Sequence, residues 1–376
     1  MTVRVLVTGA DGFIGRNLMV HLGEQHGYEP SAFTRRDPVA NLETLASRAD
    51  VIVHLAGINR TEDPADFVRG NVDLTSALCD AIEVGADGGR YPVVIYASSI
   101  HAERDTDYGR SKRGAEARLS AAAKASGIDA HVFRLPNVFG KWCRPNYNSA
   151  IATFCHNIAR GLPIRIDDPD AVMRLVYIDD VVSAFLRIIR GEAPAREPEG
   201  FATVSPEYRP TLGQVAAQLH AFRGSRENHI VERVGCGLTR ALYSTYLSYL
   251  DPADFDYPVT VHRDPRGAFA EMLRTRDSGQ ISFFTAGPGV TRGGHYHHSK
   301  TEKFLVVKSR ARFCFRHMVT GERHVVDVDG NIPRIVETIP GWAHDITNTG
   351  DEDMVVLLWA NEQFDPNSPD TVQAAV

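Results

Sequence analysis

Four residues near the C-terminal end of this 376-residue chain have the types and the spacing of a metal-binding site. His295 and His297 are one residue apart, so on a strand both side chains project from the same face. Glu302 follows after a short turn, and His344 lies about 40 residues further on. Three imidazoles and a carboxylate suit a divalent transition metal and leave room for water or substrate. The pattern therefore predicts a metal site, with zinc as the first choice.

The alternative is that this histidine-rich stretch is a solvated surface patch. Each half of the motif, however, stands beside a strand-like run, at residues 304–307 and 354–359, which favours ligands held by strands. His298 would point to the opposite face and is not included in the site. The four ligands leave two roles open for the ion, because it could take part in chemistry or only stabilise the fold.

A second set of candidate functional residues begins near the N-terminal end of the chain. Gly9, Gly12 and Gly15 follow the apolar run 3–7 directly and lead into a helical pattern. Glycines at such a turn let the backbone approach a pyrophosphate, which the helix N-terminus attracts. The GxxGxxG spacing, together with Tyr108 and Lys112, resembles the extended short-chain dehydrogenase/reductase family. The residues expected to hold the cofactor are Gly9, Asp11, Gly12, Phe13, Ile14 and Gly15 in the turn, His54, Leu55 and Ala56 after the next apolar run, and Tyr108 and Lys112.

Tyr108 and Lys112 are one helical turn apart, so both side chains share a helix face. The ammonium can lower the pKa of the phenol and bind the nicotinamide ribose, while the tyrosine exchanges a proton with the substrate oxygen. Ser99, with Ser98 as the alternative, is expected to polarise the substrate carbonyl. Ser99 precedes Tyr108 by only nine residues, fewer than in typical family members, so either an insertion is missing or another group polarises the carbonyl.

The end of the second expected strand indicates which cofactor binds. Where NAD-preferring sites place an acidic residue, this chain has Phe33-Thr-Arg35-Arg36. Two guanidinium groups fit the 2′-phosphate of NADPH, so Arg35 and Arg36 predict NADPH over NADH, unless both are ordinary solvated charges.

The composition and the hydrophobic pattern of the chain limit which architectures are possible. The length suits two domains, and a formal net charge of -6 argues against nucleic acid or an anionic membrane as a partner. The N-terminus reads as a strand, and no apolar run is long enough to span a membrane, so we expect a soluble, cytoplasmic protein. The five cysteines are scattered and are expected to be reduced. Strand-helix alternation predicts an α/β Rossmann-type doubly wound parallel sheet over residues 1–250, and short strands with Gly and Pro turns predict an all-β barrel over residues 251–376.

The C-terminal stretch resembles the two sequence boxes of the metal-binding cupin family, a jelly roll. Nearly end to end, the chain resembles the bifunctional capsular-polysaccharide enzymes of the CapF/WbjC type, in which a short-chain reductase precedes a cupin. The strings that carry this resemblance are residues 96–100, 136–148, 152–155, 295–298, 302–307 and 361–366.

The resemblance implies a nucleotide-sugar enzyme in the route to UDP-N-acetyl-L-fucosamine. The cupin would epimerise C3 of UDP-2-acetamido-2,6-dideoxy-β-L-arabino-4-hexulose, and the reductase would reduce the C4 ketone with NADPH to give UDP-2-acetamido-2,6-dideoxy-β-L-talose. It also implies a homodimer. The residues expected to contact the UDP-sugar are Ser99, Asn137, Lys141, Arg144, Asn148 and Arg174, although Arg174 could equally be an ordinary exposed arginine.

Two other functions stay open. The cupin could be purely structural in an NAD(P)-dependent nucleotide-sugar reductase or epimerase, or the whole chain could be a non-catalytic NADPH and metal sensor. An intact pair of Tyr108 and Lys112 argues against a sensor.

Overall fold

The structure is a computed structural model that describes residues 2–86 and 90–376, and the chain forms two compact units. The first unit contains Met1–Leu219 and Ala241–Leu250, and the second contains His220–Arg240 and Asp251–Val376. Residues 220–240, which we expected in the first domain, thus fall in the second unit. The reason is long-range strand pairing, because strand β8 (Ile230–Val231) lies parallel to β10 (Gly267–Thr275).

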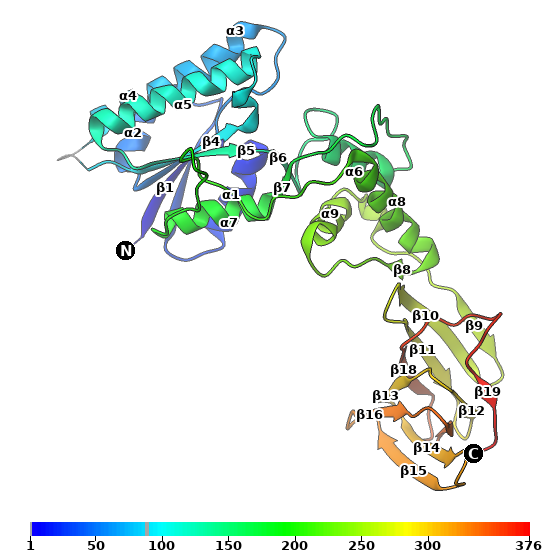
Figure 1. The fold of residues 1–376 in the computed structure, drawn as a ribbon. Coiled ribbons are helices and arrows are strands. Elements are labelled where there is room, and N and C mark those ends of the chain that lie inside the picture. Colours follow the sequence, from blue (N-terminus) through cyan, green and yellow to red (C-terminus); the bar gives the residue numbers. More distant parts are fainter. Residues whose placement is uncertain (1, 87–89) are drawn as a thin grey trace. The chain divides into compact units, whose positions relative to one another are not determined.

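The first unit is built on a five-stranded parallel sheet with the strand order β2-β1-β3-β4-β5 (Figure 1). Its strands are β1 (Val3–Thr8), β2 (Tyr28–Phe33), β3 (Val51–His54), β4 (Val93–Ser99) and β5 (Ala130–Leu135). The direction of strand succession reverses between β1 and β3. In open α/β sheets, ligands bind at such a reversal, beyond the carboxyl ends of the strands.

Helices cover both faces of this sheet (Figure 1). One face carries α1 (Phe13–Gly23) and α7 (Ile178–Ile189), and the other carries α2 (Asn41–Arg48), α4 (Leu74–Gly85) and α5 (Asp107–Ser126). Apolar strand residues pack against the second group of helices, and the buried members include Leu6, Ile52, Val94, Leu42, Leu78 and Leu119. The doubly wound α/β fold expected from the sequence is confirmed.

Further elements complete the part of the chain before the second set of strands. They are α3 (Pro64–Phe67), a π-helical segment (Val68–Asp73), a 3-10 turn (Ile100–Glu103), β6 (Asn137–Phe139), α6 (Ala150–Ala159), β7 (Leu175–Tyr177), α8 (Leu212–Asn228), α9 (Gly237–Leu247) and a second 3-10 turn (Pro252–Asp254). Strands β6 and β7 pair in parallel as a separate ribbon.

The second unit contains two β-sheets that are antiparallel apart from β8. One sheet has the order β16-β13-β18-β11-β10-β8 with β9 beside β10, and the other has the order β15-β14-β17-β12-β19. The strands are β9 (Val261–Asp264), β10, β11 (Gln280–Ala286), β12 (Thr291–Tyr296), β13 (Glu302–Lys308), β14 (Arg310–His317), β15 (Arg323–Asp329), β16 (Ile335–Thr338), β17 (Trp342–Asn348), β18 (Met354–Ala360) and β19 (Val372–Gln373).

The two sheets share one apolar core. Every second residue of β11 is buried, as period-two alternation requires, and the aromatic ring of Phe304 on β13 packs edge-on against Phe313 on β14 with centroids 5.6 Å apart. This is the all-β architecture expected for the C-terminal part of the chain.

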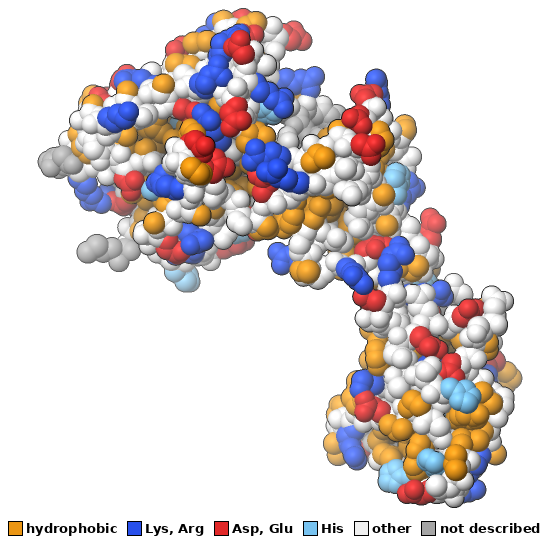
Figure 2. Space-filling model, in the orientation of Figure 1, with side chains coloured by type: hydrophobic (Ala, Val, Ile, Leu, Met, Phe, Trp, Pro, Cys, Tyr) orange, Lys and Arg blue, Asp and Glu red, His pale blue; other side chains and the backbone are white. Residues whose placement is uncertain are grey.

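The surface carries charges of both signs. Basic and acidic side chains are interspersed on the face of the molecule drawn in Figure 2. Among the described residues, no helix combines the length and the apolar character needed to cross a membrane.

Candidate active sites

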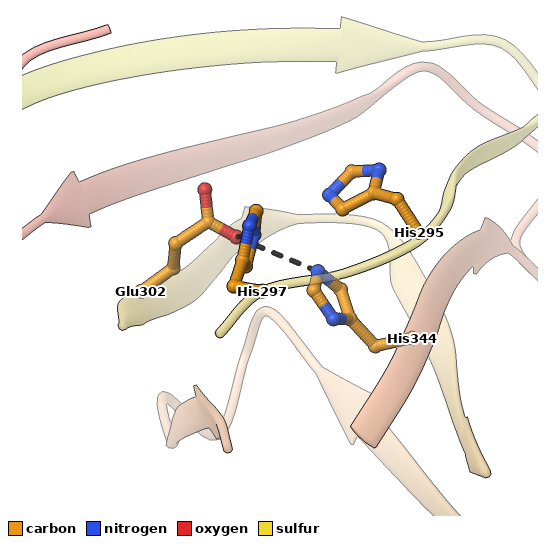
Figure 3. Close-up of side chains that lie close together, drawn as sticks. All are labelled: His295, His297, Glu302 and His344. Atoms are coloured by element: carbon orange, nitrogen blue, oxygen red, sulfur yellow. Dashed lines mark hydrogen bonds and ion pairs between the residues drawn. The ribbon is translucent and has the colours of Figure 1, made fainter. Parts of the chain in front are cut away.

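Three strands and one short loop bring the predicted metal ligands together (Figure 3). His295 lies on β12 opposite His344 on β17, and Glu302 is the first residue of β13. His297 follows directly after β12. One ligand atom from each of the four side chains lies within 4.8 Å of those of the others, and His297, Glu302 and His344 are buried. The structure thus brings together all four residues proposed from their spacing.

Hydrogen bonding at the imidazoles supports a cation among them. His297 Nδ1 donates to the backbone carbonyl of Asp370, and His344 Nδ1 lies 3.4 Å from the carbonyl of Trp342. Both Nε2 atoms therefore present lone pairs, and they face Glu302 Oε2 at 3.2 and 3.5 Å. His344 Nε2 is buried without a hydrogen-bond partner. Lone pairs directed at a carboxylate repel each other unless a positive ion lies between them, so these residues fit a divalent metal.

The electrostatics of His295 favour the ligating form. Burial, together with the neighbouring imidazoles of His344 and His297, lowers the pKa of His295 to about 4. The ring is therefore neutral at pH 7, as a metal ligand must be.

Two supporting residues of this site were not found from the sequence. The carboxylate of Asp370 accepts hydrogen bonds from the backbone of His298, Ser299 and Lys300, at 2.9, 2.7 and 2.8 Å. Lys300 Nζ lies 3.2 Å from Glu302 Oε1. Asp370 stands about 70 residues after the loop that it holds, so no local pattern indicates it; the position of Lys300 inside the motif was a signal that could have been used.

A cavity of about 640 Å³ opens beside the cluster, entirely within the second unit. His295, Lys300 and Glu302 line one side of it, and His229 and Glu271 are among the residues that line the rest. Its volume is that of a typical small-molecule site.

The glycine turn of the first unit has the backbone geometry of a phosphate cradle. Gly9 follows β1 with φ +69°, and a Cβ there would lie 2.7 Å from the backbone nitrogen of Ala56. A Cβ at Gly15, in α1, would lie 2.2 Å from the carbonyl oxygen of Gly9. Leu55 and Ala56 follow β3, so the turn and the second expected cofactor segment meet at the strand-order reversal. The position fits a dinucleotide, whose pyrophosphate would lie at the N-terminus of α1, beside Phe13 and Ile14.

Ser99 and Tyr108 meet at the carboxyl end of β4. Burial raises the pKa of Tyr108, and a hydrogen bond with the Ser99 hydroxyl counteracts part of that rise. Ser98 is occupied elsewhere, because its Oγ donates to Glu116 Oε1 at 2.5 Å, and Glu116 is also held by Arg134. Of the two candidate serines, Ser99 is therefore the one placed beside the tyrosine.

Lys112 differs from the expectation in one respect. It is buried one turn after Tyr108 on α5, but its Nζ donates to the carbonyl of Ala97 at 3.1 Å and to the hydroxyl of Tyr96 at 3.4 Å. The lowering of the Tyr108 pKa that we expected from this ammonium is not found: burial raises that pKa, and the group that counteracts the rise is Ser99, not Lys112. Burial also lowers the pKa of Lys112 itself to about 8.

Two more residues near Tyr108 were missed. His101 lies in the 3-10 turn after Ser99, with its ring centroid 6.3 Å from that of Tyr108, so it is a candidate for the additional carbonyl-polarising group. Asn71, in the π-helical segment, donates to Ser111 Oγ at 2.9 Å and to Ile58 O at 2.9 Å. Its amide ties the loop after β3 to the catalytic helix α5.

The ring of His54 is engaged inside the protein, so any contact of this residue with a cofactor would have to use its backbone. Its Nδ1 lies 2.7 Å from Thr8 Oγ1 and its Nε2 lies 3.0 Å from Thr75 Oγ1, so both ring nitrogens are used inside the protein. Burial lowers its pKa to about 3 and keeps it neutral. His54 therefore anchors the strand-order reversal from within.

The two arginines after β2 are exposed. Arg35 Nε lies 3.9 Å from the carboxylate of Asp11 in the glycine turn, and 87 % of the Arg35 side chain is accessible. The guanidinium groups are thus close to the turn and available to a ligand.

The expected substrate contacts lie in several different environments. Arg174 is paired with Glu207 through two bonds of 2.9 and 2.7 Å, and its carbonyl accepts from the Asn137 side chain. Lys141 is paired with Asp179, whereas Arg144 stacks over Tyr147 and Asn148 is exposed.

The segment 141–148 contacts the nucleotide-binding edge, because Asn59 accepts from the Tyr147 hydroxyl and Arg16 donates to the carbonyl of Trp142. A diphosphate could displace Glu207 from Arg174, but in this structure the arginine is already neutralised.

Known families match both units. Residues 5–201 match the NAD dependent epimerase/dehydratase family, and residues 262–372 match the polysaccharide biosynthesis C-terminal domain. The chain belongs to the NAD dependent epimerase/dehydratase family, in a form that continues into this second domain.

Proteins that are similar to this chain over its whole length define a more specific group within this family. The chain is 55% identical over 374 residues to a UDP-2-acetamido-2,6-beta-L-arabino-hexul-4-ose reductase from Pseudomonas aeruginosa, covering 100% of this chain and 99% of the relative. The crystal structure of the capsular polysaccharide assembling protein CapF from Staphylococcus aureus superposes with a TM-score of 0.92 at 40% identity, covering 99% of this chain and 100% of that one. The resemblance to the CapF/WbjC type is confirmed. A UDP-glucuronic acid 4-epimerase from Bacillus cereus, at 18% identity and a TM-score of 0.54 over 66% of this chain and 98% of its own, shares only the fold.

Proposed function

We propose that this chain epimerises C3 of UDP-2-acetamido-2,6-dideoxy-β-L-arabino-4-hexulose at the second unit and reduces its C4 ketone with NADPH at the first, giving UDP-2-acetamido-2,6-dideoxy-β-L-talose for capsular polysaccharide synthesis. The observation that carries the proposal is that one chain, similar from end to end to a reductase of such a sugar, holds two separate sets of reactive side chains.

In the reduction, Tyr108 gives its proton to the C4 oxygen and Ser99 donates a hydrogen bond to the same oxygen. NADPH, when bound, supplies the hydride. The ammonium of Lys112, fixed by Ala97 and Tyr96, is placed to bind the nicotinamide ribose. A rise in the Tyr108 pKa through burial suits the role of a proton donor, because the phenol stays protonated until the alkoxide forms.

In the epimerisation, the ketone at C4 makes the C3 proton acidic. His295, His297, Glu302 and His344 would hold a divalent ion, for which we propose zinc, and the ion supplies a Lewis acid for negative charge that develops at the C4 oxygen. The adjacent cavity has the volume to admit the sugar ring to these residues.

We also propose that Arg35 and Arg36 bind the 2′-phosphate of NADPH. Their exposure and the position of Arg35 beside the glycine turn support this preference. We further propose a homodimer, on the strength of the similarity to cupin-containing relatives and the unpaired edges of both sheets.

The division of labour is tested with two full-length variants. Tyr108→Phe should lose at least about 100-fold in NADPH oxidation while retaining exchange of the C3 proton with deuterated solvent, because only the reductive proton donor is removed. Glu302→Gln should lose the C3 exchange. If Glu302→Gln, with its metal removed, exchanged the C3 proton at the wild-type rate, the second unit would not be the epimerase. NADPH binding without any oxidation by the wild-type protein would favour a sensor instead.

A further inference from the structure

The cavity beside the metal ligands contains a second group of reactive side chains. His229, Glu271 and Arg274 all line it, and none of them belongs to the metal cluster. They come from the loop between α8 and β8 and from β10, away from the strands that carry the ligands.

The backbone holds His229 in an uncommon conformation. Its φ is +58°, in the left-handed region, which residues other than glycine adopt rarely. The pairing of β8 with β10 fixes it there, because Arg274 N donates to His229 O at 2.8 Å. A backbone conformation of this kind at the wall of a cavity supports a functional hypothesis for the side chain.

The side chain of His229 lies near a carboxylate. Its Nδ1 lies 4.0 Å from Glu271 Oε1, and both side chains are largely buried, with 13% and 14% accessible. Arg274 Nε in turn donates to the same carboxylate and holds it in place. Nδ1 is the ring nitrogen nearest this carboxylate, so in the inference below Nε2 is the nitrogen that meets a molecule in the cavity.

The other basic or acidic groups of the cavity are less suited to removing a proton. Lys300 is engaged in an ion pair with Glu302, and Glu271 is engaged by Arg274. Glu227 and His262 are exposed, so solvent competes for them. A part-buried imidazole beside a fixed carboxylate is the arrangement that general bases most often use.

We propose that His229 is the base that removes the C3 proton of the 4-keto sugar and that Glu271 is the residue that positions it. This inference rests on the epimerase function proposed above. In the forward step, the C3–H bond breaks, the proton moves to the free nitrogen of His229, and the electron pair of that bond moves toward the C4 oxygen to form an enolate. Water protonates C3 on the opposite face, and the imidazolium returns its proton to solvent, so the net change is the configuration at C3.

The test is deuterium incorporation at C3 of UDP-2-acetamido-2,6-dideoxy-β-L-arabino-4-hexulose in D2O, without NADPH. The variant is His229→Asn, because asparagine tolerates the left-handed backbone but lacks the imidazole. We expect exchange to fall at least about 100-fold while the metal content of the protein stays equal to that of the wild type, and added imidazole should restore part of the rate. His262→Asn, on another wall of the cavity, is the matched control and should exchange normally.

A wild-type protein that does not exchange C3 would refute the epimerase function itself. Wild-type exchange that persists in His229→Asn would leave that function standing and overturn this inference alone. Loss of exchange together with loss of the metal would also overturn it, since His229 would then only support the fold. For the positioning role, Glu271→Gln should lower the maximal rate of exchange about 10-fold with little change in KM; a change in KM alone would contradict that role.

Discussion

Two adjacent serines at the end of β4 have different partners, and this decides which of them can act on a substrate. Ser99 meets Tyr108, whereas Ser98 belongs to a buried network with Glu116 and Arg134. Ser99→Ala should lower kcat/KM for ketone reduction about 10- to 100-fold with little change in Tm. Ser98→Ala should instead lower the unfolding free energy by about 1–3 kcal/mol, because Glu116 loses a buried donor. Steady-state kinetics and thermal unfolding of both variants check this, and the reverse pattern would identify Ser98 as the catalytic serine.

The buried ammonium of Lys112 gives the reductase a pH dependence. Burial lowers its pKa to about 8, so the charged form is present below that pH and is lost above it. We expect kcat/KM for NADPH-dependent reduction to fall as the pH rises through about 8. Glu116 raises the pKa of Lys112, so Glu116→Gln should move this fall to lower pH. A pH profile that is flat between pH 7 and pH 9 in the wild-type protein would show that the charge of Lys112 is not needed.

Single residues also show which parts of the candidate sites could be predicted from the sequence alone. The cluster of four proposed metal ligands was predictable because strand alternation relates His295 to His297 and because Glu302 and His344 each stand beside an apolar strand. The role of His54 was not, because its partners Thr8 and Thr75 come from other elements and only the folded chain shows that both ring nitrogens are occupied.

At the scale of elements, pairing between strands that are distant in sequence limited how well the strands and the domain boundary could be predicted. Apolar runs indicated strands β1, β3, β4 and β5 of the first sheet, whereas β2 is largely polar and was expected only from the cofactor-binding pattern at its end. The two-residue strand β8 could not be recognised, because its only reason to be a strand is its pairing with β10. For the same reason, residues 220–240 were expected in the first domain although they lie in the second unit.

The C-terminal segment acts as a clamp on the metal loop. Asp370 holds the loop 298–300 through its carboxylate and orients His297 through its carbonyl. Asp370→Ala should therefore weaken metal binding about 10- to 100-fold, as removal of a residue that supports a ligand typically does. Asp365→Ala is the control and should bind metal normally, because Asp365 lies in the same segment and its carboxylate accepts from the backbone of the nearby Asn367. Isothermal titration of the metal-free proteins with zinc measures both, and equal affinities would show that Asp370 does not position the site.

At the scale of the whole molecule, each set of reactive residues is complete within one unit. Ser99, Tyr108 and Lys112 belong to the first unit, and the metal ligands with their cavity belong to the second. Because neither set takes a residue from the other, a defect in one site should leave the other intact.

This independence predicts complementation between two inactive proteins. Tyr108→Phe should still epimerise and Glu302→Gln should still reduce, so neither alone should form the talose product at the wild-type rate. A mixture of the two should restore product formation, with a lag that shortens as the total protein concentration rises, because the epimerised sugar must diffuse from one molecule to the other. Chromatographic separation of the sugar nucleotides over time measures this. If the mixture formed no more product than the separate variants, although each kept its own half-reaction, the intermediate would have to pass directly between sites of one assembly.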